Sequence, residues 1–181
     1  MPQIPYPELN EVAPDVKEFY ENMPVKLNMA KMACHSSALV KPFLKLGSAI
    51  LLKSKTPATL RELLILRIAA ITNSHYELYH HEHIAKQTGI DDSYIKVAQD
   101  KSTKNYEVLP EDIKVVFKVA DDVIGIGRIS SQVMDELKRL FSNEIVVELS
   151  IISGYYTMVS QYLQSLDINT EDDRIANRIS S

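Results

Sequence analysis

The chain has 181 residues, 45% of them hydrophobic, and a net charge of −4 from 20 basic and 24 acidic residues. This length suits one compact domain, and because no stretch concentrates positive charge we expect no nucleic-acid partner. The N-terminus does not resemble a secretory signal, and no apolar run approaches the ~20 residues that cross a bilayer. We therefore expect a cytoplasmic protein without a membrane partner.

The distribution of apolar residues predicts an all-α fold. Glycine occurs only 5 times, and apolar side chains recur at intervals of three and four, as on helices packed against helices. Five of the eight prolines lie in the first 24 residues, so we expect an irregular arm over residues 1–25 with a short helix begun by Pro14. Residues 26–166 are expected to form a single helical domain, followed by a polar tail over 167–181.

Within that domain the pattern predicts a series of helices. The first runs over 37–53, and the second carries the apolar stretch 63–71, which should be buried on most sides at the centre of the domain. A third helix runs from residue 73 or 74 to a stop at Gly89, and a short helix follows over 91–98. After a polar loop, helical stripes cover 113–124 and 133–141, and a long apolar helix covers 144–166. We expect Tyr155, Tyr156 and Tyr162 of this last helix to form part of a subunit interface.

The candidate chemistry is concentrated in one segment. Four of the five histidines lie in HYELYHHEH, residues 75–83, and histidine is the side chain best suited to exchange protons near neutral pH. On a helix Glu77 and His81 share a face at i and i+4, so the carboxylate can orient the imidazole. Glu62 lies in the apolar run LRELLILRIAA and needs a partner if it is buried, for which a histidine is suitable.

Each of these residues has a simpler alternative role. Glu62 follows Thr59 by three residues and Glu77 follows Ser74 by three, and both pairs match the capping box of a helix start. Arg67, on the buried helix, is either an anion clamp or part of a structural ion pair. Only the positions of the side chains can distinguish these structural roles from the catalytic and binding roles.

Cofactors and metals receive no support from the sequence. The stretch HHEH lacks the HExxH spacing that places two imidazoles on one face, so we expect no metal site. Glycine-rich nucleotide motifs are also missing, and we expect no cofactor. Cys34 is the single cysteine and cannot form a disulfide within the chain; it is expected to be a small buried side chain, with a reactive thiol beside His35 as the alternative.

Residues 61–90, RELLILRIAAITNSHYELYHHEHIAKQTGI, resemble the carboxymuconolactone decarboxylase superfamily, which includes alkylhydroperoxidase D and many peroxidase-related proteins. The resemblance extends from the NMAKMACHSS stretch to VVELSIISGYYTMVSQYL, and implies the all-helical alkylhydroperoxidase D-like fold in a homo-oligomer, commonly a trimer or hexamer. The redox branch carries Glu, eleven residues, CxxC, three residues and His. Glu62 and His81 occupy the Glu and His positions, but Ser74 and Glu77 occupy the two cysteine positions.

A dithiol peroxidase cycle needs both cysteines, so the resemblance points to the thiol-free decarboxylase branch, which has the YE and His seen here as Tyr76, Glu77 and His81. We therefore expect a cofactor-independent enzyme that decarboxylates or isomerises a small carboxylated or lactone-like substrate. His81, Glu77 and Glu62 are the expected catalytic residues. The expected substrate-binding residues are Arg67, His80 and Ser74. The alternatives are a peroxidase-related antioxidant protein acting through Cys34, and a catalytically silent oligomer that binds a ligand or partner.

Overall fold

The structure is a computed structural model, and it describes residues 2–104, 106–107 and 109–171. Over these residues the chain forms helices and no strand, which confirms the all-α prediction. The helices are α1 (Pro14–Glu21), α2 (Asn28–Ala33), α3 (Val40–Lys53), α4 (Ala58–Thr72), α5 (His75–Gln87), α6 (Asp92–Gln99), α7 (Glu111–Ile126), α8 (Ser131–Leu140) and α9 (Asn143–Ser165). They group into two compact units, one formed by the chain up to Lys53 together with the segment from Tyr162 onward, the other by Ser54–Gln161.

The first unit has its own small core. Proline at the first position of α1 starts this helix without losing a hydrogen bond, because the first N–H groups of a helix have no partner within it. Buried side chains from α1, α2 and α3 pack together, with Phe43 edge-on to Tyr162 at a ring-centroid distance of 5.6 Å. The Tyr162 hydroxyl donates a hydrogen bond to the Met29 carbonyl at 3.1 Å. The end of α9 therefore belongs to this unit.

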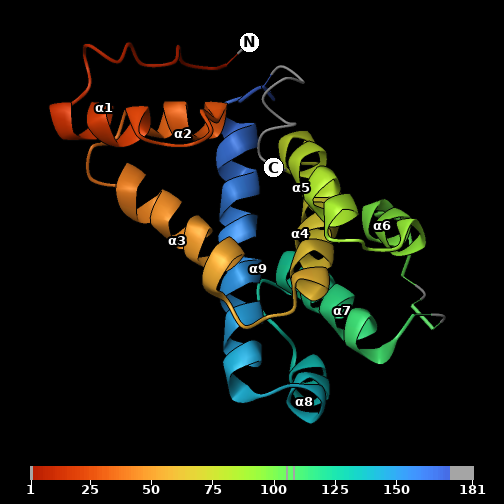
Figure 1. Cartoon of the computed structure of the whole chain (residues 1–181). Helices are drawn as coiled ribbons and strands as arrows, with labels where there is room; N and C mark the ends of the chain where they lie inside the picture. Colours follow the sequence, from red (N-terminus) through yellow and green to blue (C-terminus); the bar gives the residue numbers. More distant parts are fainter. Residues whose placement is uncertain (1, 105, 108, 172–181) are drawn as a thin grey trace. The chain divides into compact units, whose positions relative to one another are not determined.

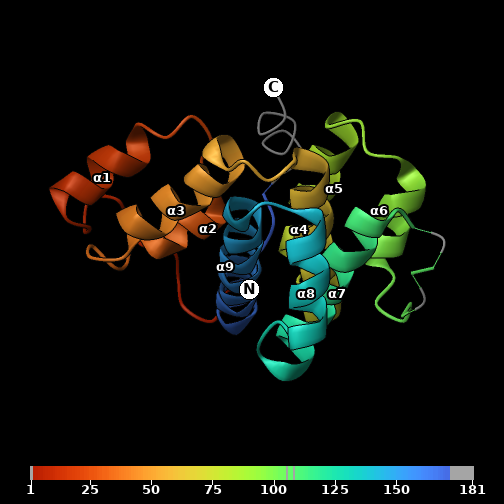
Figure 2. The ribbon, with the colours of Figure 1, turned by 90° about the horizontal axis from the view of Figure 1, so that it is seen from below.

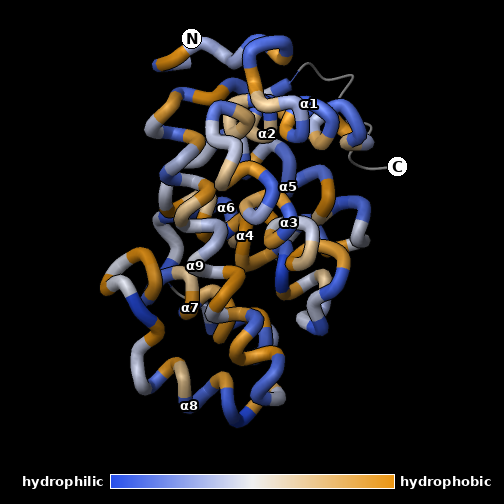
Figure 3. Tube along the Cα trace, turned by 90° about the vertical axis from the view of Figure 1, so that its left-hand side faces the viewer, coloured by the Kyte–Doolittle hydropathy of each residue, from blue (hydrophilic) through white to orange (hydrophobic). Residues whose placement is uncertain are grey.

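The second unit is built around α4. Every residue of α4 from Leu60 to Ala70 is buried, as its nearly continuous apolar sequence predicted. The helix packs against α5, α6 and α7 (Figure 1), and in Figure 3 its trace is largely hydrophobic. Helix α8 packs on α7 (Figure 2), with Val133 and Leu137 as its buried residues. The charged groups of α4, on Arg61, Glu62 and Arg67, are consequently held in the interior of this unit.

A tight turn joins α4 to α5 and sets their relative register. Asn73 ends α4 with a left-handed backbone, φ 58°, a conformation that asparagine tolerates better than most residues. The Ser74 amide then donates to the Ala69 carbonyl at 2.8 Å. Because the chain reverses direction so sharply, side chains on the first turns of α4 and the middle of α5 can meet.

Helix α9 corrects one expectation about assembly. Tyr155 and Tyr156 are 6% and 3% exposed within the single chain, so they are core residues and do not supply a subunit interface. The exposed large apolar side chains of this helix are instead Val147, Ile151 and Met158. The sequence could not distinguish core tyrosines from interface tyrosines, because the period of a helix does not show which of its faces packs against the rest of the unit.

The predicted division at residues 25 and 166 stays a prediction. Of the expected tail over 167–181, residues 172–181 lie outside the described part of the chain. The preceding residues, 167–171, pack within the first unit: the Asn28 side-chain amide donates to the Asn169 carbonyl at 3.0 Å, and the Asn28 backbone amide donates to the Glu171 carboxylate.

Candidate active site

Glu62 and His81 meet inside the second unit. Glu62 lies on α4 and is 0% exposed; its Oε2 is 2.7 Å from Nδ1 of His81 on α5. Its other oxygen, Oε1, accepts a hydrogen bond from Nε of Arg61 at 3.0 Å. A buried carboxylate requires such partners, since an unpaired buried charge is strongly destabilising. Both oxygens of Glu62 are therefore bound by cationic or potentially cationic groups.

A second carboxylate faces the other nitrogen of the same imidazole. Glu77 lies one helical turn before His81, and its Oε2 is 3.4 Å from Nε2. This contact is longer than a normal hydrogen bond, whereas the contact of Nδ1 with Glu62 has an optimal length. The His81 ring therefore lies between two carboxylates, one held tightly and one loosely.

The surrounding charges decide the protonation of His81. Burial lowers its pKa, but the charge and hydrogen bond of Glu62, together with the nearby Glu77 carboxylate, outweigh burial and raise the pKa to about 9. Burial raises the pKa of Glu62, and His81 with Arg61 more than reverses this and holds it below its usual value. Near neutral pH the group is thus an imidazolium between carboxylates, with a proton on each ring nitrogen.

Tyr156 of α9 covers the imidazole. Its ring meets that of His81 edge to face at a centroid distance of 5.1 Å. Burial raises the pKa of Tyr156 well above its usual value, and the charges of Glu77 and Glu62 raise it further. The phenol therefore stays neutral and contributes an apolar wall that keeps bulk water from the ion pairs.

The capping-box alternative is wrong for both carboxylates. The N-cap of α4 is Pro57 and not Thr59, and the Glu62 carboxylate is bound by Arg61 and His81. Ser74 is the N-cap residue of α5, but its side chain makes no capping hydrogen bond. The Ser74 hydroxyl is buried and has no hydrogen-bond partner among the described residues, so it is available to a polar ligand or a water molecule.

Arg67 does not join this group. Its guanidinium donates to Asp121 Oδ1 at 3.1–3.2 Å, to the Asp100 carbonyl at 2.6 Å and to the Thr103 carbonyl at 2.7 Å. It is 0% exposed and faces the Tyr106 ring. Of the two alternatives given by the sequence, the structure shows the structural ion pair, because every nitrogen of this guanidinium already has a protein acceptor.

His80 faces a different environment from His81. Its ring packs on Tyr76 at a centroid distance of 4.5 Å and on Tyr79 at 5.2 Å. Neighbouring residues on a helix point about 100° apart, which places His80 and His81 in different surroundings. Of the expected site residues, the structure brings together Glu62, Glu77 and His81.

Sequence reasoning missed Arg61 and Tyr156. Arg61 directly precedes Glu62 in the same apolar run. A second charged residue in a segment that the pattern predicts to be buried could have identified it as a partner of Glu62. Tyr156 gave no comparable signal, because only the packing of α9 on α5 brings it to the imidazole.

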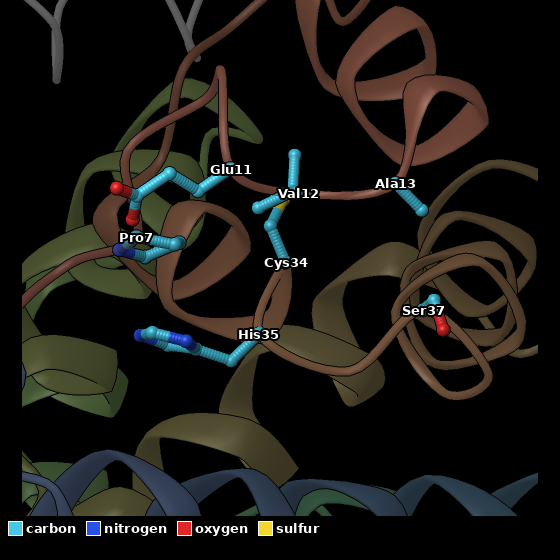
Figure 4. Close-up of a pocket in the computed structure, with 7 residues that line it drawn as sticks. All are labelled: Pro7, Glu11, Val12, Ala13, Cys34, His35 and Ser37. Atoms are coloured by element: carbon cyan, nitrogen blue, oxygen red, sulfur yellow. The ribbon is translucent and has the colours of Figure 1, made fainter.

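Cys34 lines a separate cavity of about 290 Å³ in the first unit, with Pro7, Glu11, Val12, Ala13, His35 and Ser37. Figure 4 shows the sulfur turned toward Val12, while the His35 ring and the Glu11 carboxylate lie near Pro7. The thiol donates to the Ala30 carbonyl at 3.3 Å, and burial raises its pKa. A thiol with a raised pKa is a poorer nucleophile near neutral pH.

The part of the chain that the structure describes offers neither a cluster of metal-ligating side chains nor a membrane-spanning helix. No group of three or more His, Cys, Asp or Glu side chains in it could hold a metal ion. None of its helices combines the length and apolarity that a membrane crossing requires.

No protein-family model and no curated protein sequence matches this chain. Solved structures do match it over nearly its full length. An alkylhydroperoxidase AhpD core protein from Ralstonia eutropha JMP134, described as an uncharacterized peroxidase-related protein, has a TM-score of 0.77 at 13% identity, over 95% of this chain and 93% of its own. An uncharacterized peroxidase-related protein from Silicibacter sp. TM1040 has a TM-score of 0.75 at 14% identity, over 96% and 92%.

A third similar structure is a cysteine-to-alanine variant of the debrominase Bmp8 in complex with 2,3,4-tribromopyrrole. Its TM-score is 0.71 at 18% identity, over 93% of this chain and 90% of its own. Identities this low establish a shared fold and leave the activity open. The resemblance noted in the sequence is therefore confirmed at the level of architecture: the chain has the alkylhydroperoxidase D-like fold.

Proposed function

We propose that the chain is a cofactor-independent enzyme that uses His81 as a proton donor and acceptor on a small carboxylated or lactone-like substrate, in a decarboxylation or an isomerisation. The observation that carries this proposal is the position of the His81 imidazole between Glu62 and Glu77. Paired carboxylates fix the ring and keep it protonated, which is the state a general acid needs.

The two ring nitrogens have different roles in this proposal. The Nδ1 proton is held by Glu62 at 2.7 Å, whereas the Nε2 proton faces Glu77 across the longer 3.4 Å contact. Loss of CO₂ from a carboxylated substrate leaves its bonding electron pair on carbon as an enolate. The Nε2 proton is transferred to that carbon, and the neutral imidazole takes up a proton from water before the next turnover. In an isomerisation the imidazolium first donates its Nε2 proton to one carbon, and the neutral ring then removes a proton from another.

Ser74 and Glu77 would complete the binding site. The Ser74 hydroxyl lacks a partner among the described residues and can bind a substrate oxygen, while Glu77 keeps the charge that stabilises the imidazolium. His80 stays a proposed contributor to stabilising the enolate oxygen. Arg67 is no longer proposed, because its donors are occupied. That a debrominase of similar fold binds a halogenated pyrrole supports a small molecule as substrate.

The proposal is tested by turnover of substrate candidates, measured as CO₂ release or lactone isomerisation over a panel of small carboxylated lactones. We expect His81→Ala to lower kcat by ~10²- to 10⁴-fold, the usual cost of losing a proton-transfer group. Glu77→Gln should also lower kcat, because an amide lacks the charge that supports the imidazolium. His75→Ala is the matched control, since His75 is an exposed histidine on the same helix. Full activity of the His81 variant on a confirmed substrate would refute the proposal.

Assembly and location are further proposals. The resemblance implies a homo-oligomer, a trimer or a hexamer, and the exposed Val147, Ile151 and Met158 of α9 supply apolar surface for it. A cytoplasmic location is likewise proposed from the sequence.

A further inference from the structure

Arg61 differs from the other buried arginine in having unused donors. Its side chain is 11% exposed, the largest value among the four charged side chains of the cluster, His81 included, compared with 0% for Glu62. Its Nε donates to Glu62, but neither terminal nitrogen donates a hydrogen bond to any residue that the structure describes. The two terminal NH₂ groups of this nearly buried guanidinium therefore keep donors that no described residue uses.

A nearly buried guanidinium with unused NH₂ donors is suited to bind an anionic ligand. Polar groups inside proteins are almost always paired, and the fork formed by the arginine nitrogens matches the two oxygens of a carboxylate. Arg67 provides the comparison within the same helix, because all of its nitrogens have protein acceptors. Protein acceptors therefore account for all three guanidinium nitrogens of Arg67, but only for Nε of Arg61.

The position of Arg61 places a bound anion beside the proton donor. Arg61 and His81 bind the two oxygens of the same carboxylate, Oε1 and Oε2 of Glu62. With His81 protonated, the charges of Arg61, Glu62, His81 and Glu77 sum to zero. An added anion is therefore stabilised only where it forms a direct ion pair with one of the cations. The free nitrogens of Arg61 are the one such point in the part of the cluster that the structure describes.

We propose that Arg61 binds the carboxylate of the substrate through its two terminal nitrogens. This inference rests on the proposed function and deepens it, because it assigns an anionic carboxylate as the group that the site recognises. In this proposal Arg61, and not Arg67 as the sequence predicted, is the arginine that binds the substrate. A carboxylate held in this way is bound by the guanidinium that shares Glu62 with the imidazole.

The test uses binding and does not depend on turnover. Benzoate is the probe, benzamide is the neutral probe of the same shape, and dissociation constants are measured by calorimetry on the full chain. We expect the wild-type protein to bind benzoate more tightly than benzamide. Arg61→Met should weaken benzoate about 10- to 100-fold, the usual worth of hydrogen bonds to a charged group, and leave benzamide unchanged. Arg61→Lys keeps the charge but not the fork, and should give a smaller loss.

Arg139→Met is the matched control. Arg139 is 60% exposed and pairs with Glu111 on the surface, so its loss should leave benzoate binding unchanged. Circular dichroism and melting temperature establish that each variant is folded; if Arg61→Met does not fold, Arg61→Lys decides. The proposal is overturned if the wild-type protein does not bind benzoate at millimolar concentration, or if the folded Arg61 variant binds it as tightly as the wild type. Such a result would leave the acid–base proposal standing, which fails separately if His81→Ala keeps full turnover.

Discussion

The raised pKa of His81 makes the stability of the protein depend on pH in a calculable way. The pKa of this histidine is about 9 in the folded chain, against an ordinary value of 6.5. A group with a raised folded-state pKa contributes stability that is fully present below the unfolded value and is lost as the pH rises through the folded value. His81 therefore stabilises the fold at and below neutral pH and ceases to do so above pH 9.

The size of the effect follows from the two pKa values. The linkage relation gives about 3 kcal/mol at pH 6.5 for this one residue, and most of this contribution is lost by pH 9. The glutamates of the unfolded chain do not titrate in that interval, because ordinary glutamates ionise near pH ~4. Since small domains are stable by only ~5–15 kcal/mol in total, the loss is large enough to measure.

Urea unfolding at a series of pH values between 6 and 9 provides the assay, with the free energy obtained from the midpoint and slope of each transition. The wild-type protein should lose about 2–3 kcal/mol across the interval. His81→Gln removes the titrating group, so its stability, whatever its absolute value, should be nearly flat. His75→Gln, which changes an exposed histidine, should follow the wild type. Parallel curves for the wild type and the His81 variant would refute the reasoning.

Three further predictions follow from the fold and the site. Arg67→Met should lower the free energy of unfolding by about 3 kcal/mol or more, because it removes the buried guanidinium that binds Asp121 and the Asp100 and Thr103 carbonyls, and a loss below about 1 kcal/mol in urea titration would contradict this. Cys34→Ser should leave any peroxide-reducing activity unchanged, since burial raises the pKa of the thiol, and the disappearance of robust thiol-dependent turnover in this variant would favour the single-thiol alternative. Sedimentation at micromolar concentration should show an oligomer; a monomer there would count against the proposed assembly and against a role for the exposed apolar residues of α9.

The helical architecture could be predicted from the sequence because it depends on local patterns. Apolar residues at intervals of three and four, and proline at the start of α1, act within one or two helical turns. The burial of α4 followed from its composition, since a segment that is apolar on all sides has no stable position on a surface. The pairing of Glu77 with His81 was predictable for the same reason, because residues at i and i+4 lie together on any helix.

Tertiary structure alone decided which charged groups meet across helices. Glu62 and His81 are nineteen residues apart, and their contact depends on the left-handed turn at Asn73 that folds α5 back on α4. The sequence left open whether Glu62 caps its helix, because a capping box and a buried ion pair can use the same spacing.

The two arginines of α4 show the same division between sequence and structure. By composition Arg61 and Arg67 are equivalent: each is a cation in an apolar helix that needs a partner. The structure gives Arg67 acceptors from the loop after α6 and from Asp121 on α7, and gives Arg61 only Glu62. A sequence determines that a charge will be buried, because burial follows from its neighbours along the helix. Which donors stay unoccupied depends on side chains that are distant in the chain, and only their packing in three dimensions settles it.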